Sequence, residues 1–130
     1  AHDALNEHDY AQTQTDRRLA AMRERVQDFI AANLSNPDLT TVLIAQRCGI
    51  SVRYLHAAFE ATDWTVASYV REMRLQKCRA ALHDPTMTGR SVTEIAYAWG
   101  FSDASHFSRA YKQRFGCAPS QDRIIGAVEI

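Results

Sequence analysis

The sequence lacks the features that mark several large classes of protein. Its 130 residues contain no long apolar run, so no segment is expected to span a membrane. The start shows no cluster of positive charge followed by an apolar stretch, so no secretory signal is visible. The first residue is Ala rather than Met. This favours a fragment of a longer protein, although removal of Met or a tag remnant leaves the same start.

Cysteine is scarce, and the three cysteines Cys48, Cys78 and Cys117 are widely spaced and odd in number. The pattern excludes a disulfide framework and matches no zinc-binding spacing. We expect Cys48 and Cys78 to pack as small apolar residues in a reducing cytosol. None of the five histidines pairs with another at ligand spacing. The sequence therefore indicates no metal and no other cofactor.

The sequence also lacks the common signatures of catalysis. It has no Gly-rich loop that could cradle a phosphate, and no Ser–His or Cys–His pair within a locating motif. We therefore expect that the protein is not an enzyme. Because a helical sequence can conceal an active site, turnover of a small molecule is the observation that would overturn this expectation.

Net charge is zero, with 15 basic and 15 acidic residues, but the charge is unevenly distributed. Residues 1–16 hold four acids and no Lys or Arg, so residues 17–130 carry 15 basic against 11 acidic groups. A surplus of four positive charges is modest for a nucleic-acid partner. Whether a nucleic-acid partner is expected therefore depends on where the basic side chains point.

The hydrophobic pattern is helical along the whole chain, and no credible strand is present. Residues 1–15 are polar without a clear period and are interpreted as a linker or N-terminal tail. From Asp16 to about Asn33, apolar residues recur at steps of three and four. Pro37 follows and prevents the helix from continuing. The sequence predicts an all-α fold.

Further helix starts are marked by side chains that accept hydrogen bonds from the free amides of a first turn. A long helix is predicted over residues 66–82, and "SVTE" at 91–94 forms a capping box. Pro119 is expected to open a last short turn. The predicted helix caps are Thr40, Ser51, Thr65, Ser91 and either Ser102 or Asp103.

One short segment occurs twice, as "IAQRCGIS" at 44–51 and "IAYAWGFS" at 95–102. In each copy a helix ends at Gly, an apolar residue follows, and a Ser can cap the next helix. The Ala of each copy allows two helices to approach closely. This is the anatomy of a helix-turn-helix, whose second helix can enter the major groove of DNA.

From about residue 39 to 123 the chain resembles the DNA-binding domain of the AraC/XylS family of transcription regulators. The best match is "SVTEIAYAWGFSDASHFSRAYKQRFGCAPSQDR" at 91–123. The resemblance implies seven helices in two helix-turn-helix subdomains, joined by one long helix. The expected division is a polar linker or tail at 1–15, a first subdomain at 16–62, a linker helix at 63–84 and a second subdomain at 85–130.

The resemblance also implies a function and partners. Both recognition helices are expected to enter successive major grooves of double-stranded DNA, and a linker helix of 17 residues, about 26 Å long, agrees with grooves roughly 34 Å apart. The protein is expected to be a bacterial, cytoplasmic, nucleoid-associated regulator and an activator that recruits RNA polymerase. A missing N-terminal effector or dimerisation domain is also implied. The alternative is a helical protein-interaction module that has lost DNA binding.

The candidate reading residues follow from the faces of the two predicted recognition helices. Arg53 and Arg109 can each donate two hydrogen bonds to guanine, and Lys112 can hold a phosphate. A helix face that points away from the buried stripe brings these groups together with short polar residues. The predicted DNA-binding residues are Ser51, Val52, Arg53, His56, Ala57, Ser102, Ala104, Ser105, His106, Ser108, Arg109 and Lys112.

Several residues have other interpretations. The basic stripe Arg71, Arg74 and Lys77 on the long helix is expected to be a solvated face or to pair with acids such as Glu72. Trp64 and Trp99 are expected to be core residues near turns. Members of the family often have Arg where this chain has Ala57, and Ala57 can instead touch a thymine methyl. They also often have an aromatic residue where this chain has Asp122, which bears on how the last helix packs.

Overall fold

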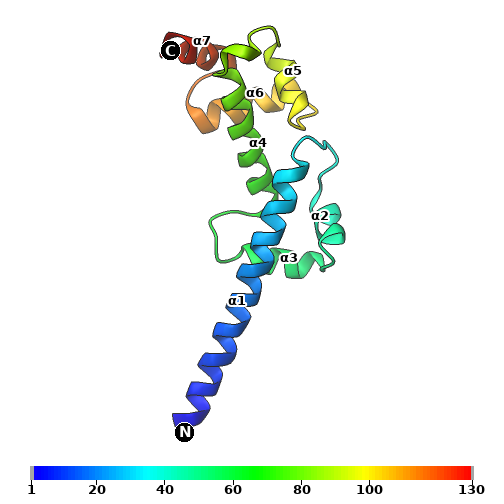
Figure 1. Ribbon diagram of the computed structural model, residues 1–130, viewed down its shortest axis with the longest axis vertical. Coiled ribbons are helices and arrows are strands. Elements are labelled where there is room, and N and C mark those ends of the chain that lie inside the picture. The colour runs from blue at the N-terminus through cyan, green and yellow to red at the C-terminus, as the bar shows by residue number, and fades with distance from the viewer. Residues whose placement is uncertain (1, 130) are drawn as a thin grey trace. The chain divides into compact units, whose positions relative to one another are not determined.

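The computed structural model describes the backbone of residues 2–129 and the side-chain surroundings of residues 6–127. Helices and loops make up all of the described chain, without a strand (Figure 1). The predicted all-α fold with seven α-helices is confirmed. The elements are α1 (His2–Asn33), α2 (Thr41–Arg47), α3 (Val52–Phe59), α4 (Val66–Leu82), the 3₁₀-helix η1 (Pro85–Met87), α5 (Val92–Ala98), α6 (Ala104–Phe115) and α7 (Pro119–Glu129).

Helix α1 begins earlier than the sequence pattern predicts, at His2 rather than Asp16. Residues 6–13 are exposed, so no apolar period marks this part of the helix. Local bonds support it instead: the amide of Gln12 donates to the carboxylate of Asp16 over 3.2 Å. Because the segment also contains no Gly or Pro, helix propensity allows it to continue the amphipathic part. The segment predicted to be a polar linker or tail is therefore helical from His2.

The chain divides into two compact units. The first comprises α1 up to Ala32 together with Thr40–Ala67, and the second comprises Asn33–Leu39 together with the chain from Ser68 onward. Within the first unit, Arg23 donates from Nη1 to the carbonyl of Ala58 over 2.8 Å, which ties α1 to the end of α3. The buried residues of this unit are Val26, Ile30, Ile44, Ala45, Leu55, Ala58, Phe59 and Val66.

The core of the second unit contains a row of aromatic rings. Phe101 and Phe107 meet edge to face at 4.9 Å between centroids, and Tyr111 lies 5.6 Å from Phe107. Such pairs contribute beyond their buried area because the ring edges and faces carry opposite partial charge. The buried cluster is Leu75, Cys78, Leu82, Ile95, Ala96, Phe101, Phe107 and Tyr111.

The cysteines follow the prediction in part. Cys78 is fully buried in the core of the second unit, and burial raises the pKa of its thiol to about 12. It therefore behaves as a small apolar residue, as predicted. Cys48 is only half-buried, although burial also raises the pKa of its thiol.

Arg74 departs from the expected solvated stripe on the long helix. Its guanidinium donates from Nε to the carbonyl of Leu34 over 2.9 Å and from Nη2 to that of Asn36 over 2.6 Å. A Cβ added at Gly100 would lie 2.3 Å from the Leu34 oxygen and 2.7 Å from the guanidinium. Arg74 therefore holds the segment after α1 within the second unit, and only Gly fits beside it.

Asp122 explains how the last helix packs. Predicted as a short turn, α7 extends over 11 residues. Asp122 is only 4% exposed and accepts hydrogen bonds from the Tyr111 hydroxyl over 2.5 Å and from His83 Nε2 over 3.0 Å. Arg79 Nε lies 3.4 Å from its Oδ2. A carboxylate suits this position because three polar side chains converge on it.

Hydrogen bonds, aided by nearby positive charge, keep this buried carboxylate ionised. Burial by itself would raise the pKa of Asp122, but the hydrogen bonds from Tyr111 and His83 and the positive charge of Arg79 outweigh it. The pKa of Asp122 therefore lies below its ordinary value. Burial and the neighbouring carboxylate raise the pKa of Tyr111, so its hydroxyl remains a donor.

Candidate DNA-binding surface

Each copy of the repeated segment forms a tight turn with the same backbone hydrogen bond. Ile50 N–H donates to the carbonyl of Ala45 over 3.0 Å in the first unit. Phe101 N–H donates to the carbonyl of Ala96 over 3.1 Å in the second. The glycine within each turn has a positive φ, 71° at Gly49 and 97° at Gly100. The repetition in sequence is therefore a repetition in structure, and each turn leads from one helix into another.

In the first unit, the turn leads into α3. Ser51 begins this helix, and its hydroxyl accepts a hydrogen bond from Tyr54 N–H over 3.0 Å. One side of α3 is buried through Leu55, Ala58 and Phe59. Most of the predicted reading residues lie away from this buried side. Ala57, next to buried Ala58, is half-buried, and the others are exposed: Ser51, Val52, Arg53 and His56.

In the second unit, the turn leads into α6. Relative to the repeated segment, α6 begins later than α3 does. Asp103 rather than Ser102 is its N-cap, and its carboxylate accepts a hydrogen bond from His106 N–H over 2.9 Å. Phe107 and Tyr111 are buried, and Ala104 is half-buried. The other predicted residues are exposed: Ser102, Ser105, His106, Ser108, Arg109 and Lys112.

The start of α6 carries a negative charge that is absent from the predicted set of site residues. The hydrogen bond from His106 N–H holds the pKa of Asp103 below its ordinary value, aided by Ser105 N–H and by the charges of Arg109 and His106. The sequence leaves Ser102 and Asp103 as equal candidates for the cap. An Asp directly before the helix is the signal for a fixed negative charge beside the reading face.

The two tryptophans differ. Trp99 packs partly against the core of the second unit, and Lys77 Nζ lies 5.7 Å from the centre of its ring. Trp64, in contrast, is 40% exposed, so the prediction that it is a core residue is wrong. It lies in the loop between α3 and α4, where its indole stays partly open to solvent.

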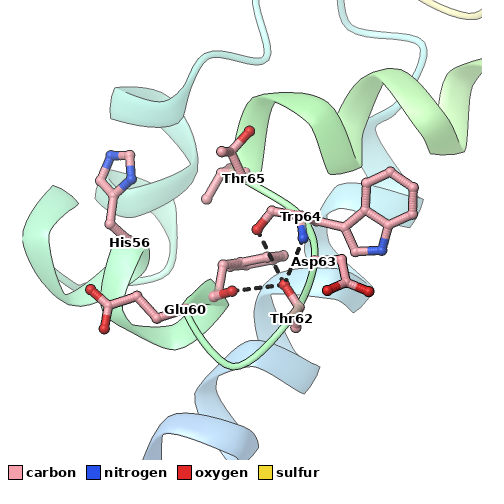
Figure 2. Close-up of a pocket in the computed structure, with 8 residues that line it drawn as sticks. His56, Glu60, Thr62, Asp63, Trp64 and Thr65 are labelled. Carbon is pink, nitrogen blue, oxygen red and sulfur yellow. Dashed lines mark hydrogen bonds between the residues drawn. The ribbon is translucent and has the colours of Figure 1, made fainter.

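A cavity of about 350 Å³ lies beside this loop in the first unit. In Figure 2, His56 and Glu60 extend from the α3 side, and Trp64 lies across from them on the loop. The Thr62 hydroxyl shapes the loop, because it donates to the carbonyl of Phe59 over 2.7 Å and accepts from Trp64 N–H over 3.1 Å. The lining residues are His56, Phe59, Glu60, Thr62, Asp63, Trp64, Thr65 and Val66.

Within the part of the chain that the structure describes, no group of three or more His, Cys, Asp or Glu side chains gathers in a way that could hold a metal ion. No described helix is both long enough and apolar enough to span a membrane.

Comparison with known proteins supports the assignment of the two turns to helix-turn-helix units. The family model described as a helix-turn-helix domain matches residues 44–124. The chain is 37% identical over 95 residues to the transcriptional activator NphR of a Rhodococcus species, a match that covers 73% of this chain and 28% of NphR. It is 37% identical over 98 residues to the XylDLEGF operon transcriptional activator of Pseudomonas putida, which covers 75% of this chain and 30% of that protein.

A solved structure shows the same fold. The chain is 30% identical to an AraC-type transcriptional regulator from Chromobacterium violaceum, with a TM-score of 0.68 over 90% of this chain and 96% of that one. The chain spans less than a third of the length of the two activators it matches. The match of the family model over more than half of the chain, together with these relatives, shows that the chain belongs to the AraC/XylS family of transcription regulators.

Proposed function

We propose that this chain is the DNA-binding part of a transcription regulator and recognises a specific double-stranded sequence through α3 and α6. The observation that carries the proposal is the pair of equivalent turns, each followed by a helix with one buried side and one exposed side of polar and basic residues. In this arrangement the exposed side of each second helix can lie in a major groove. The membership of the family and the activator relatives support the same function.

The proposal assigns a role to each exposed group. Arg53 on α3 and Arg109 on α6 read guanine, because a guanidinium can donate two hydrogen bonds to one base edge. Lys112 holds a phosphate and contributes affinity without sequence preference. Ala57 offers a methyl group to thymine, and the remaining predicted residues supply contacts to base edges or phosphates. These residues are Ser51, Val52, His56, Ser102, Ala104, Ser105, His106 and Ser108.

The organisation of the chain follows the same proposal. Residues 16–62 and 85–130 act as the two helix-turn-helix subdomains, and residues 63–84 as the linker helix. Residues 1–15 connect to a further N-terminal domain that binds an effector or dimerises. This chain covers only a small part of the relatives' length, which supports such a domain.

We further propose that the regulator acts in the bacterial cytoplasm at the nucleoid and activates transcription by recruiting RNA polymerase. The relatives named as activators support activation. The family consists of regulators rather than enzymes, so no catalytic role is proposed. The family and its relatives likewise do not favour the alternative of a protein-interaction module that has lost DNA binding.

Selection of DNA sites from a random-sequence pool, at two salt concentrations, tests this function. We expect a recovered site with two short blocks about one helical turn apart, because each reading helix meets one major groove. We also expect affinity to fall steeply as salt rises, because phosphate contacts release counterions. A failure to bind DNA even at low salt would contradict the proposal and support the protein-interaction module.

A further inference from the structure

A buried ion pair joins the second recognition helix, α6, to the long helix α4. The side chain of Glu72 on α4 is only 6% exposed, whereas that of its partner Arg114 on α6 is 48% exposed. Arg114 Nε donates to both carboxylate oxygens of Glu72, with 3.0 Å to Oε2. Gln76 Nε2 donates to the same Oε2 over 3.3 Å. Arg114 follows Arg109 by five residues, about 140° around the helix, so it faces α4 rather than the proposed reading side.

The last turn of α6 meets α4 at a second point. The centre of the Phe115 ring lies 4.7 Å from Cζ of Arg79 and 5.0 Å from Cζ of Arg114. Such contacts depend on direction, because the positive charge is attracted to the face of the ring. Glu72 and Arg79 are seven residues apart, which is two turns, so both lie on one side of α4. Charged groups therefore fix the end of α6 to that side of α4 at two points.

Stability alone does not explain an ion pair at this position. A buried carboxylate loses its hydration, and the attraction of its partner does little more than offset that loss. Apolar side chains of similar size often stabilise a fold as well as a buried ion pair does. The core of this unit already holds α6 through Phe107 and Tyr111. The ion pair adds direction, because a hydrogen bond weakens steeply when its donor and acceptor turn away from each other.

We infer that Glu72 is a positioning residue for DNA recognition, which holds α6 at the rotation where Arg109 meets a base edge. Because a helix turns as one body, a rotation at Arg114 also moves Arg109. A rotation of about 20° moves an atom about 5 Å from the helix axis by roughly 2 Å. Hydrogen bonds to a base edge tolerate only about 0.5 Å. Loss of the ion pair should therefore weaken sequence discrimination more than it weakens the fold. The inference rests on the proposed function.

Glu72→Met tests this role, because it removes the carboxylate and keeps a side chain of similar length. Arg114 loses its partner but is half exposed, so it can turn to solvent and the chain should stay folded. Site selection identifies the α6 block as the one in which Arg109→Ala loses preference. In that block we expect Glu72→Met to lower base preference about three- to tenfold, since a misdirected Arg109 keeps only part of its contact. The α3 block should keep its preference.

Two further variants separate positioning from other roles. Glu24→Met removes the same charge at an exposed position on α1, and it should change base preference in neither block. The double variant Glu72→Met/Arg114→Met replaces both members of the pair by apolar side chains. It should lose no more preference than Glu72→Met, because the two residues act through one contact. Urea denaturation shows whether each variant is folded. If Glu72→Met does not fold, the double variant carries the test with the same expected loss.

The opposite results would overturn the inference. If the folded variants keep the wild-type preference in the α6 block, the ion pair does not set the rotation of α6. An equal loss in both blocks would mean a general loosening of the chain rather than positioning of one helix. A clearly larger loss in the double variant would show that Arg114 contacts DNA itself. If the wild-type chain shows no salt-dependent DNA binding at all, the proposed function fails, and the inference with it.

Discussion

The two helix-turn-helix units share one turn geometry but are supported differently. In the first unit the glycine of the turn, Gly49, stands in open space, with no atom within 4 Å of an added Cβ. In the second unit Gly100 is enclosed by the carbonyl of Leu34 and the guanidinium of Arg74. The glycine of the first turn is thus required only for its backbone conformation. The glycine of the second turn is required for its conformation and also because no side chain fits there.

The polar side chains that link helices also differ between the two units. In the second unit Asp122 joins α7 to α6 and α4 through Tyr111 and Arg79, and it also meets His83 after the end of α4. Buried Glu72 on α4 also pairs with Arg114 on α6. In the first unit, a polar tie between α1 and α3 is the bond from Arg23 to the carbonyl of Ala58. Helix α6 is therefore held by charged groups in addition to its buried aromatic rings.

The largest expected effect is that of Gly100→Ala compared with Gly49→Ala. At both positions a left-handed backbone costs a non-Gly residue about 1–2 kcal/mol. At Gly100 the added methyl also meets a backbone oxygen that cannot turn away, which should cost about 1–3 kcal/mol more. Urea denaturation should therefore show the larger loss for Gly100→Ala. Equal losses would mean that the enclosure of Gly100 does not matter.

The next effect concerns the buried carboxylate. Asp122→Ala leaves the Tyr111 hydroxyl and the charge of Arg79 without their partner, which should lower the free energy of unfolding by about 2–3 kcal/mol. Asp28→Ala, at an exposed position on α1, is the matched control and should stay within about 0.5 kcal/mol of the wild type. A small loss for Asp122→Ala would show that the polar cluster does not hold α7.

The same carboxylate predicts a dependence on pH. Because the pKa of Asp122 is lowered in the folded state, the unfolded chain takes up the proton first as pH falls. The stabilisation should be complete above about pH 4 and decrease below it. Chemical denaturation at pH 6 and pH 3 should therefore show a gap between the wild type and Asp122→Ala that narrows at pH 3. A gap that stays constant would contradict the ionised state.

A smaller effect is expected from Lys112→Ala on α6. The variant loses one phosphate contact, so affinity should fall similarly for all sequences and the salt slope should decrease by roughly one. Gln113→Ala, which is exposed on the same helix but uncharged, is the control and should change neither quantity. Loss of affinity for one sequence only would assign Lys112 to a base instead.

Local chemistry makes much of this fold predictable. Ser51 and Ser91 are predicted as caps because short polar side chains bond the free amides of a first turn, and both do so. The turns at Gly49 and Gly100 are predicted because a left-handed residue there favours Gly. The long helix α4 has the predicted bounds, since a helical period and a Pro both mark it.

The features that escape prediction depend on contacts between distant residues. Nothing near Asp122 in the sequence shows that it will meet His83 and Tyr111, so a break in the family pattern is the only sign. Arg74 resembles a member of a solvated stripe because its partners, two carbonyls, have no signature in sequence. The start of α1 escapes prediction since an exposed helix has no apolar period.

The sequence predicts the position of the candidate site better than it predicts the charge at the starts of its two helices. The exposed sides of α3 and α6 follow from the helical period, since the buried stripe fixes the opposite side. The choice between Ser102 and Asp103 as cap depends on where α6 begins, and a one-residue shift decides it. That shift places a carboxylate cap at one reading helix and a neutral hydroxyl cap at the other.

The central claim is that both α3 and α6 read bases, and parallel site selection with Arg53→Ala and Arg109→Ala tests it most directly. Each variant should lose sequence preference in a different one of the two blocks recovered by the wild type, with a loss of about 1–3 kcal/mol for the affected contact. The other block should stay intact in each case. If Arg109→Ala leaves the recovered site unchanged, the proposed face of α6 does not read DNA, and the account is wrong.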